Sequence, residues 1–244
     1  MSAWVRPLPV SATIDRRARG REAARHRSMM YRLQPGISFC LAADRVIFLD
    51  LDADRYFCLS PSAQRTFLRG VESEDDALLA TLATAVPLSL DPAHPLIAPC
   101  PGVGEPAGSL LDCRLPRPDW RTMLLAASSL PIATARLRLC GMAATVRHLV
   151  RCKQRLPRRA ARGDRLLQTV SAYSRLRYIA TESDQCLPRS VAVAGRLAAI
   201  GLPAVLVIGV KLQPFAAHAW VQSGEWLAND RIDVVRDFTP ILIV

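Results

Sequence analysis

The sequence has no long apolar run and no pairs of closely spaced cysteines. The apolar stretch from Leu202 to Val210 has nine residues, and fourteen when Leu197 to Gly201 before it are included, fewer than the roughly 20 that a helix needs to cross a bilayer. The seven cysteines are odd in number and form no C-x-x-C pair, which suits neither a disulfide framework nor a zinc ribbon. We therefore expect a soluble protein without a membrane partner, in a reducing compartment such as the cytoplasm.

The length and composition indicate a globular protein. The chain has 244 residues, of which 50% are hydrophobic and 22% are charged. A chain of this size can bury a substantial core, and two small domains are favoured over one large domain.

Lysine is scarce, and arginine supplies 30 of the 32 basic residues. The positive charge is local: residues 114–180 hold fifteen basic against two acidic residues, whereas residues 31–113 hold five against eleven. A basic segment can attract phosphates or an acidic partner. An Arg- and Ala-rich composition accounts for the same pattern, and we do not expect nucleic acid as a partner.

The first thirty residues contain no apolar core of a secretory signal. They hold seven arginines and two acidic residues, a composition shared with organellar transit peptides. We predict that residues 1–30 are a disordered Arg-rich extension.

Short strands are predicted from Ile37 onward. The segments ISFCLAA (37–43), RVIFLDL (45–51) and RYFCLS (55–60) are separated by very short acidic turns, as an antiparallel meander requires. Ser60-Pro61 predicts the start of a helix, and the acidic run from Ser73 to Asp76 predicts a second capped helix. Its apolar stripe consists of Leu78, Leu79, Leu82 and Val86.

The segment RVIFLDLDADRYFCLSPSAQRTFL resembles the PqqD-like domain that recognises leader peptides in the biosynthesis of ribosomally made peptides. The resemblance implies a recognition domain over residues 31–86 and a leader that adds a strand to the sheet edge. The corresponding residues are Arg55, Tyr56, Phe57, Cys58 and Leu59. The family usually continues into a third helix, but residues 87–118 contain eight prolines. We predict a linker there, with the third helix missing, shortened or displaced.

Helices are predicted after this linker, over Asp119 to Leu130, Ile132 to Lys153 and Asp164 to Ala180, with Pro131 separating the first two. His148 and Cys152 lie four residues apart and so share a helical face. No nearby residue completes a metal site, so packing or surface roles are predicted for this pair.

Cys186 opens a predicted helix that runs to about Ile200. Asp184 can cap this helix, and Pro188 is tolerated only in its first turn. A thiol at a helix N-terminus experiences the positive end of the helix dipole, which favours the nucleophilic thiolate. Buried strand PAVLVIGV (203–210) follows, and a second strand then carries His218 and Trp220 on one face.

A third strand, Glu225 to Ala228, ends at Asn229-Asp230, and TPILIV (239–244) is a candidate fourth strand. A thiol on a helix, a histidine on a strand and a carboxylate after the next strand form the order needed for a cysteine nucleophile with an oriented base. Asp230 is the predicted carboxylate, with Asp233 and Asp237 nearby. The bland alternative is an inert core thiol beside a core histidine.

The stretches CLPRSVAVAGRLAAIGLPAVLVIGV, PFAAHAWV and EWLAND resemble the B proteins of lasso-peptide maturation, which are transglutaminase-like, papain-type cysteine peptidases. The resemblance implies an α+β fold with the peptidase domain at residues 119–244, Cys186 as nucleophile, His218 as general base and Asp230 as its orienting partner. By analogy with papain-type enzymes, Gln185 and the Cys186 backbone N–H contribute to an oxyanion hole.

The same resemblance implies the substrate and the partner. The protein would cut the leader from a lasso precursor beside an asparagine-synthetase-like cyclase, and ATP dependence would belong to that cyclase. No phosphate-binding glycine loop occurs in this sequence, so no cofactor is predicted. A transglutaminase or amidase, and a non-catalytic module that binds peptide or nucleic acid, remain the alternatives.

Overall fold

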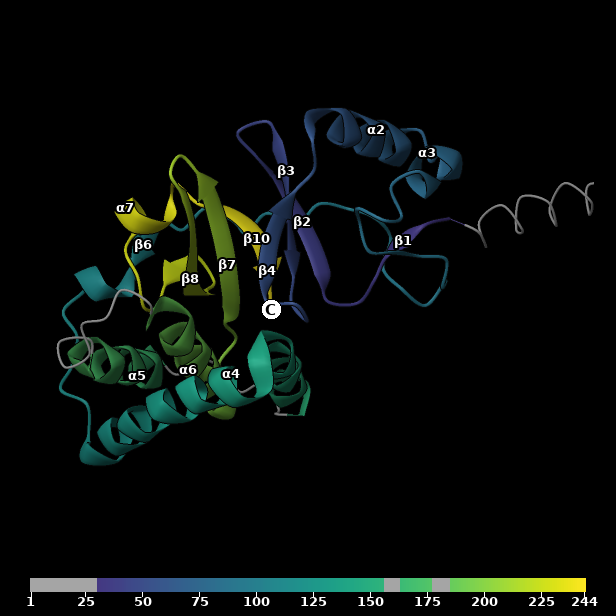
Figure 1. The fold of residues 1–244 in the computed structure, drawn as a ribbon. Coiled ribbons are helices and arrows are strands. Elements are labelled where there is room, and N and C mark those ends of the chain that lie inside the picture. Colours follow the sequence, from purple (N-terminus) through teal and green to yellow (C-terminus); the bar gives the residue numbers. More distant parts are fainter. Residues whose placement is uncertain (1–29, 156–162, 177–184) are drawn as a thin grey trace, which may run out of the picture.

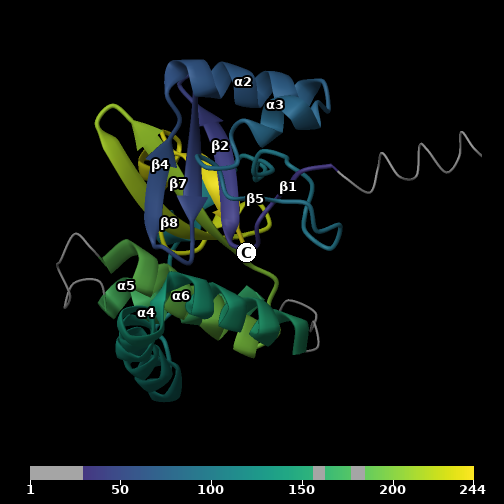
Figure 2. The same ribbon diagram turned by 45° about the vertical axis from the view of Figure 1, so that its right-hand side comes forward.

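The computed structural model describes residues 30–155, 163–176 and 185–244. The Arg-rich extension predicted at residues 1–30 lies, up to residue 29, outside the described residues. Two sheets lie beside each other, with one pair of helices above the first sheet and a layer of helices beneath (Figures 1 and 2). The predicted mixture of helix and sheet in an α+β fold is confirmed.

The first sheet is an antiparallel meander, as predicted. It contains β2 (Ile37–Ala42), β3 (Arg45–Asp50) and β4 (Arg55–Cys58) in the order β2-β3-β4. The β2–β3 turn consists of Ala43 and Asp44, which both have positive φ, the backbone of the tight hairpin turns that match strand twist. Strand β4 forms an edge of this sheet.

Helix α2 (Pro61–Glu72) begins as the sequence predicts, and the Ser60 hydroxyl accepts the N–H of Ala63 at 3.3 Å. The following helix, α3 (Asp76–Ala80), is capped within the predicted acidic run. Ser73 ends α2, and the Asp75 carboxylate accepts the N–H groups of Ala77 and Leu78. A carboxylate adjacent to the first turn satisfies these free donors and complements the helix dipole.

Pro131 does not separate two helices, contrary to the prediction. Helix α4 (Trp120–Arg155) passes through Pro131 and breaks at Gly141, where φ is 78° and ψ is 173°. Glycine adopts this left-handed φ without the steric cost of a Cβ atom. Among the described residues, α4 is the single helix whose length and apolar composition would suffice to cross a membrane, although the Gly141 break interrupts it. Helix α5 (Gly163–Leu176) packs against α4.

The second sheet has the strand order β10-β7-β8-β9-β6. It consists of β10 (Thr239–Ile243), β7 (Val205–Leu212), β8 (Phe215–Ser223), β9 (Trp226–Leu227) and β6 (Gly108–Ser109). Helix α6 (Cys186–Ala199) packs against β8, and α7 (Ile232–Val235) precedes β10. The predicted strands after α6, including the fourth, are therefore present.

The Pro-rich segment 87–118 is anchored at both of its ends. Its β5 (Leu88–Ser89) pairs with β1 (Arg32–Leu33), and β6 pairs in parallel with β9. Its one helical element is the short 3-10 turn η1 (Leu110–Asp112), so the segment holds no α-helix. The segment predicted as a linker therefore contributes one strand to a separate two-stranded sheet, β1-β5, and one strand to the second sheet.

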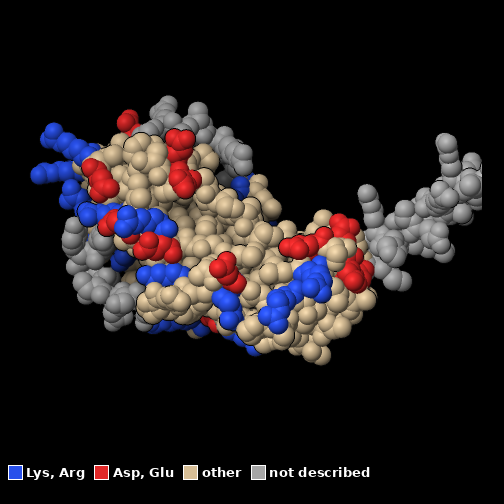
Figure 3. All heavy atoms as spheres, turned by 90° about the horizontal axis from the view of Figure 1, so that it is seen from above, with Lys and Arg blue, Asp and Glu red and all other residues tan. Residues whose placement is uncertain are grey.

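The two sheets share one apolar core. Residues Cys40, Ile47 and Leu49 of the first sheet pack with residues of β7, β8, β10 and α4, namely Ile208, Val210, Ala219, Ile241, Met142 and Val146. The opposite face of the first sheet, with Phe39 and Phe48, packs against Phe67 of α2. Arg147 of α4 and Asp52, in the turn after β3, form an ion pair at 3.2 Å. The face of the molecule in Figure 3 carries basic and acidic residues side by side around a neutral area.

Candidate active site

Cys186 is the first residue of α6 and is partly buried. Pro188 lies in the first turn, where its missing N–H costs no helical hydrogen bond. The proposed cap Asp184 lies outside the described residues. Gln185 occupies the N-cap position without a side-chain capping bond, and the backbone N–H of Leu187, in the first turn, donates to the Cys186 sulfur.

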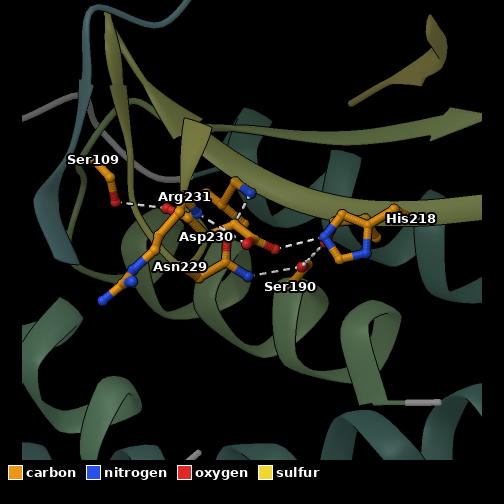
Figure 4. A network of polar contacts seen from close by, with 8 residues as sticks. Ser109, Ser190, His218, Asn229, Asp230 and Arg231 are labelled. Atoms are coloured by element: carbon orange, nitrogen blue, oxygen red, sulfur yellow. Dashed lines mark hydrogen bonds and ion pairs between the residues drawn. The ribbon is translucent and has the colours of Figure 1, made fainter. Parts of the chain in front are cut away.

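His218 lies on β8, opposite Gly209 of β7. Its Nε2 lies 2.5 Å from Oδ2 of Asp230 (Figure 4). A second side-chain hydrogen bond joins His218 to Cys186, and Nδ1 is the ring nitrogen left for it. The structure therefore brings together the three residues predicted from the sequence.

The thiol and the imidazole shift each other's pKa in opposite directions. Burial by itself would raise the pKa of Cys186, but hydrogen bonds from His218 and from the backbone N–H of Ala219 outweigh it and lower that pKa below 9.0. Burial by itself would lower the pKa of His218, but hydrogen bonds to Asp230 and Cys186 raise it to about 9. These directions favour a thiolate–imidazolium pair, the reactive state of cysteine nucleophiles.

Asp230 is held in position by the backbone of the next residue, Arg231, and by the Pro-rich segment. Its Oδ1 accepts the N–H of Arg231 at 2.9 Å, and its backbone carbonyl accepts the hydroxyl of Ser109 at 2.6 Å (Figure 4). Ser109 belongs to β6, so a residue 121 positions away in the chain fixes the loop that carries the carboxylate.

Asn229 and Ser190 complete the site, and the sequence reasoning missed both. Asn229 Oδ1 accepts the N–H of Val221 at 2.8 Å, and its Nδ2 donates to Ser190 Oγ at 2.8 Å. Ser190 Oγ in turn donates to the carbonyl of Ala219 at 2.8 Å. Ser190 follows Cys186 by four residues, so it shares a helical face with the thiol. That spacing was the available signal.

The other two aspartates near the site do not reach His218. Asp237 is exposed and pairs with Arg236 at 3.7 Å, and Asp233 lies on α7. The side-chain Oε1 of Gln185 is buried and has no hydrogen-bond partner among the described residues. Its role in an oxyanion hole stays a prediction.

The remaining predicted residues lie elsewhere. Of the β4 residues, Arg55 pairs with Asp50 at 3.5 Å, and Phe57 stacks on Phe48. His148 and Cys152 lie 3.4 Å apart, and the described part of the chain contains no group of three or more side chains suited to a metal ion.

Residues 126–243 match the family model described as the transglutaminase-like superfamily. The chain carries a transglutaminase-like domain. This superfamily includes papain-like cysteine peptidases, and a domain of this kind suggests a cysteine-type enzyme. Searches of the curated proteins and of the solved structures found no match.

The transglutaminase-like domain contains every residue of the Cys186–His218–Asp230 arrangement. It also includes most of α4, together with α5, α6 and the strands from β7 to β10. The match does not extend over the first sheet or Ser109, which contact this domain through the shared core and through Asp230.

Proposed function

We propose that the protein is a cysteine endopeptidase that cleaves the leader from a lasso-peptide precursor. The observation that carries the proposal is the hydrogen-bonded chain from Asp230 through His218 to Cys186, with the thiol pKa lowered and the imidazole pKa raised. A transglutaminase-like domain with this arrangement suits acyl transfer through a thioester.

The first half-reaction forms the acyl-enzyme. The Cys186 thiolate attacks the carbonyl carbon at the leader–core junction, and the negative charge moves to the carbonyl oxygen. As the intermediate collapses, the C–N bond breaks and the His218 imidazolium donates its proton to the leaving amine. Asp230 holds the ring orientation and stabilises its positive charge.

The second half-reaction restores the enzyme. Neutral His218 takes a proton from a water molecule, whose oxygen attacks the thioester carbon. The C–S bond then breaks, the leader leaves with a new carboxyl group that releases its proton to solvent, and the thiolate–imidazolium pair forms again. The core peptide keeps the free amine released in the first half-reaction.

Edge strand β4 supports recognition of the leader by the first sheet. An extended leader can pair with the outer edge over Arg55, Tyr56, Phe57, Cys58 and Leu59. In this proposal the sheet is a PqqD-like recognition element. An asparagine-synthetase-like cyclase, acting beside the protein in the cytoplasm, would use ATP to join the freed amine to a side-chain carboxylate.

The test is mass spectrometry of a precursor peptide encoded next to this protein's gene, incubated with the purified chain. We expect two products whose masses sum to the precursor plus one water. Cys186→Ala should abolish cleavage and keep leader affinity, while Cys113→Ala, which removes an exposed free cysteine, should cleave normally.

Other outcomes would identify the alternatives. A precursor joined to an amine with loss of ammonia would indicate a transglutaminase. Cleavage that survives Cys186→Ala would overturn the catalytic assignment. Salt-sensitive binding to unrelated nucleic acid, without any processing, would indicate a binding module.

A further inference from the structure

Strand β4 of the first sheet reaches the neighbourhood of Cys186. Tyr56 is paired with Leu49 across β3 and β4, so both side chains are on the face that packs against the second sheet. The Tyr56 ring lies 5.6 Å from the ring of Phe215, at an angle of 63°. An edge-to-face pair of this kind is a favourable aromatic contact.

Tyr56 and the catalytic residue pack against the same core. Tyr56, Cys186 and Leu187 all lie against the apolar cluster that the two sheets share. Burial, followed by the charges of Asp54 and Cys186, raises the pKa of Tyr56 to about 12. The phenol therefore stays neutral beside the thiolate.

Phe215 lies on the same side of β8. Side chains alternate along a strand, so Phe215 shares a face with Ala217 and Ala219. The backbone N–H of Ala219 donates to the Cys186 sulfur. Phe215 remains 51% exposed, which leaves much of this large apolar side chain free to contact a ligand.

From these positions we infer that Tyr56 and Phe215 form an aromatic wall beside the thiol, which holds an apolar side chain of the peptide next to the bond that Cys186 attacks. The inference rests on the proposed function and adds a specificity to it. The first sheet would then select the residue at the cut as well as bind the leader.

The geometry of strand addition supports this arrangement. A peptide strand paired with β4 would run about 4.8 Å from it, with side chains alternating between the two faces. Those on the Tyr56 face would point toward Phe215 of the second sheet and Leu187 of α6. One strand would thus supply both the backbone partner and one half of the side-chain wall.

The test compares two kinds of alkylating reagent on the full chain, iodoacetamide and peptidyl chloromethyl ketones, with the modification of Cys186 followed by mass spectrometry. Iodoacetamide reports the reactivity of the thiol alone. Peptidyl chloromethyl ketones that end in Phe, Leu or Glu report the side-chain preference near the thiol. We expect the Phe and Leu reagents to modify Cys186 faster than the Glu reagent.

Tyr56→Ala should slow the Phe and Leu reagents about tenfold, the lower range for loss of apolar contacts in a specificity pocket. Tyr56→Phe should retain the wild-type preference, since the ring remains. Leu41→Ala, which truncates a 45% exposed side chain on β2, should behave as wild type. Iodoacetamide should react equally with all four proteins.

The outcomes separate this inference from the proposed function. If wild type and Tyr56→Ala show the same preference for the Phe and Leu reagents over the Glu reagent, while Cys186 is reactive, the inference about the aromatic wall is refuted. The proposed peptidase function is not affected by that result. Faster reaction of both reagents in Tyr56→Ala would show that Tyr56 blocks the thiol, which also overturns the wall. Iodoacetamide modification of Cys186 no faster than that of exposed Cys58 would instead refute the active thiol.

Discussion

Oδ2 of Asp230 lies 2.5 Å from Nε2 of His218, and both side chains are mostly buried, with exposed fractions of 19% and 18%. The remaining oxygen of Asp230 accepts the N–H of Arg231. The carboxylate therefore has a fixed orientation, and it fixes the imidazole in turn. The loop after β9 places its charge where it raises the basicity of His218.

Asp230→Asn should lower the rate of peptide cleavage by about 10²- to 10⁴-fold, because an amide neither stabilises the imidazolium nor enforces the required tautomer. The measurement is kcat/KM on the precursor. Asp237→Asn is the matched control, since Asp237 is exposed and, within the described residues, forms an ion pair with Arg236 alone. Equal loss in both variants would contradict the role assigned to Asp230.

Cleavage should depend on pH through the ion pair. The rate should rise with pH as Cys186 loses its proton through a pKa below 9.0, and fall through about 9 as His218 loses its own. His218→Ala should move the pH dependence of iodoacetamide alkylation upward, because the groups that lower the thiol pKa are then reduced. An unchanged alkylation profile would show that the two side chains do not interact.

The same titration affects stability. Folding raises the pKa of His218 above its ordinary value of 6.5. The hydrogen bonds that raise this pKa therefore contribute in full to the free energy of unfolding at pH values below 6.5. The contribution is lost as the pH rises through about 9.

Asn229→Ala should destabilise the fold by about 1–3 kcal/mol, since it leaves the N–H of buried Val221 without its acceptor and Ser190 without its donor. Thermal unfolding should show a Tm lower by roughly 2–4 °C for each kcal/mol. Ser223 lies on the same strand as Val221, and its hydroxyl donates an exposed hydrogen bond to the Pro203 carbonyl. Ser223→Ala should therefore change the Tm much less. Similar shifts for the two variants would argue against the Asn229 bridge.

Leu49→Ala should lower the free energy of unfolding by about 2–5 kcal/mol, for the first and second sheets together. Leu49 is fully buried in the shared core. Three of the four tryptophans, Trp120, Trp220 and Trp226, lie outside the first sheet, and the fourth, Trp4, precedes the described residues. Tryptophan fluorescence and circular dichroism should therefore report one denaturation transition, shifted equally to lower denaturant concentration. If the midpoint of the fluorescence transition is unchanged, the two sheets unfold independently.

Local signals predicted much of the fold. The strands β2 to β4, the start of α2 at Ser60 and the alternation along β8 follow from hydrophobic period, turn residues and capping, which all act between near neighbours in the chain. The same holds for Cys186 at the start of α6. These features required no knowledge of the packing.

The errors and omissions arise from choices that packing decides. Pro131 and Gly141 both disturb a helix locally, and the tertiary structure places the break at Gly141. Three aspartates follow β9, and only the path of the loop selects Asp230. The contribution of Ser109 could not be predicted, because it depends on a parallel strand pair between distant segments.

The shared core also bears on how such a protein could exist as two separate chains. A cut within the Pro-rich segment would leave Ile47 and Leu49 on one fragment and Ile208 and Ile241 on the other. Each fragment would expose an apolar surface that is complementary to the other fragment. Ser109 would keep its hydrogen bond to the Asp230 carbonyl within one chain only if Ser109 stayed with the catalytic fragment. The position of the cut would therefore decide whether the reassembled enzyme regains an ordered carboxylate.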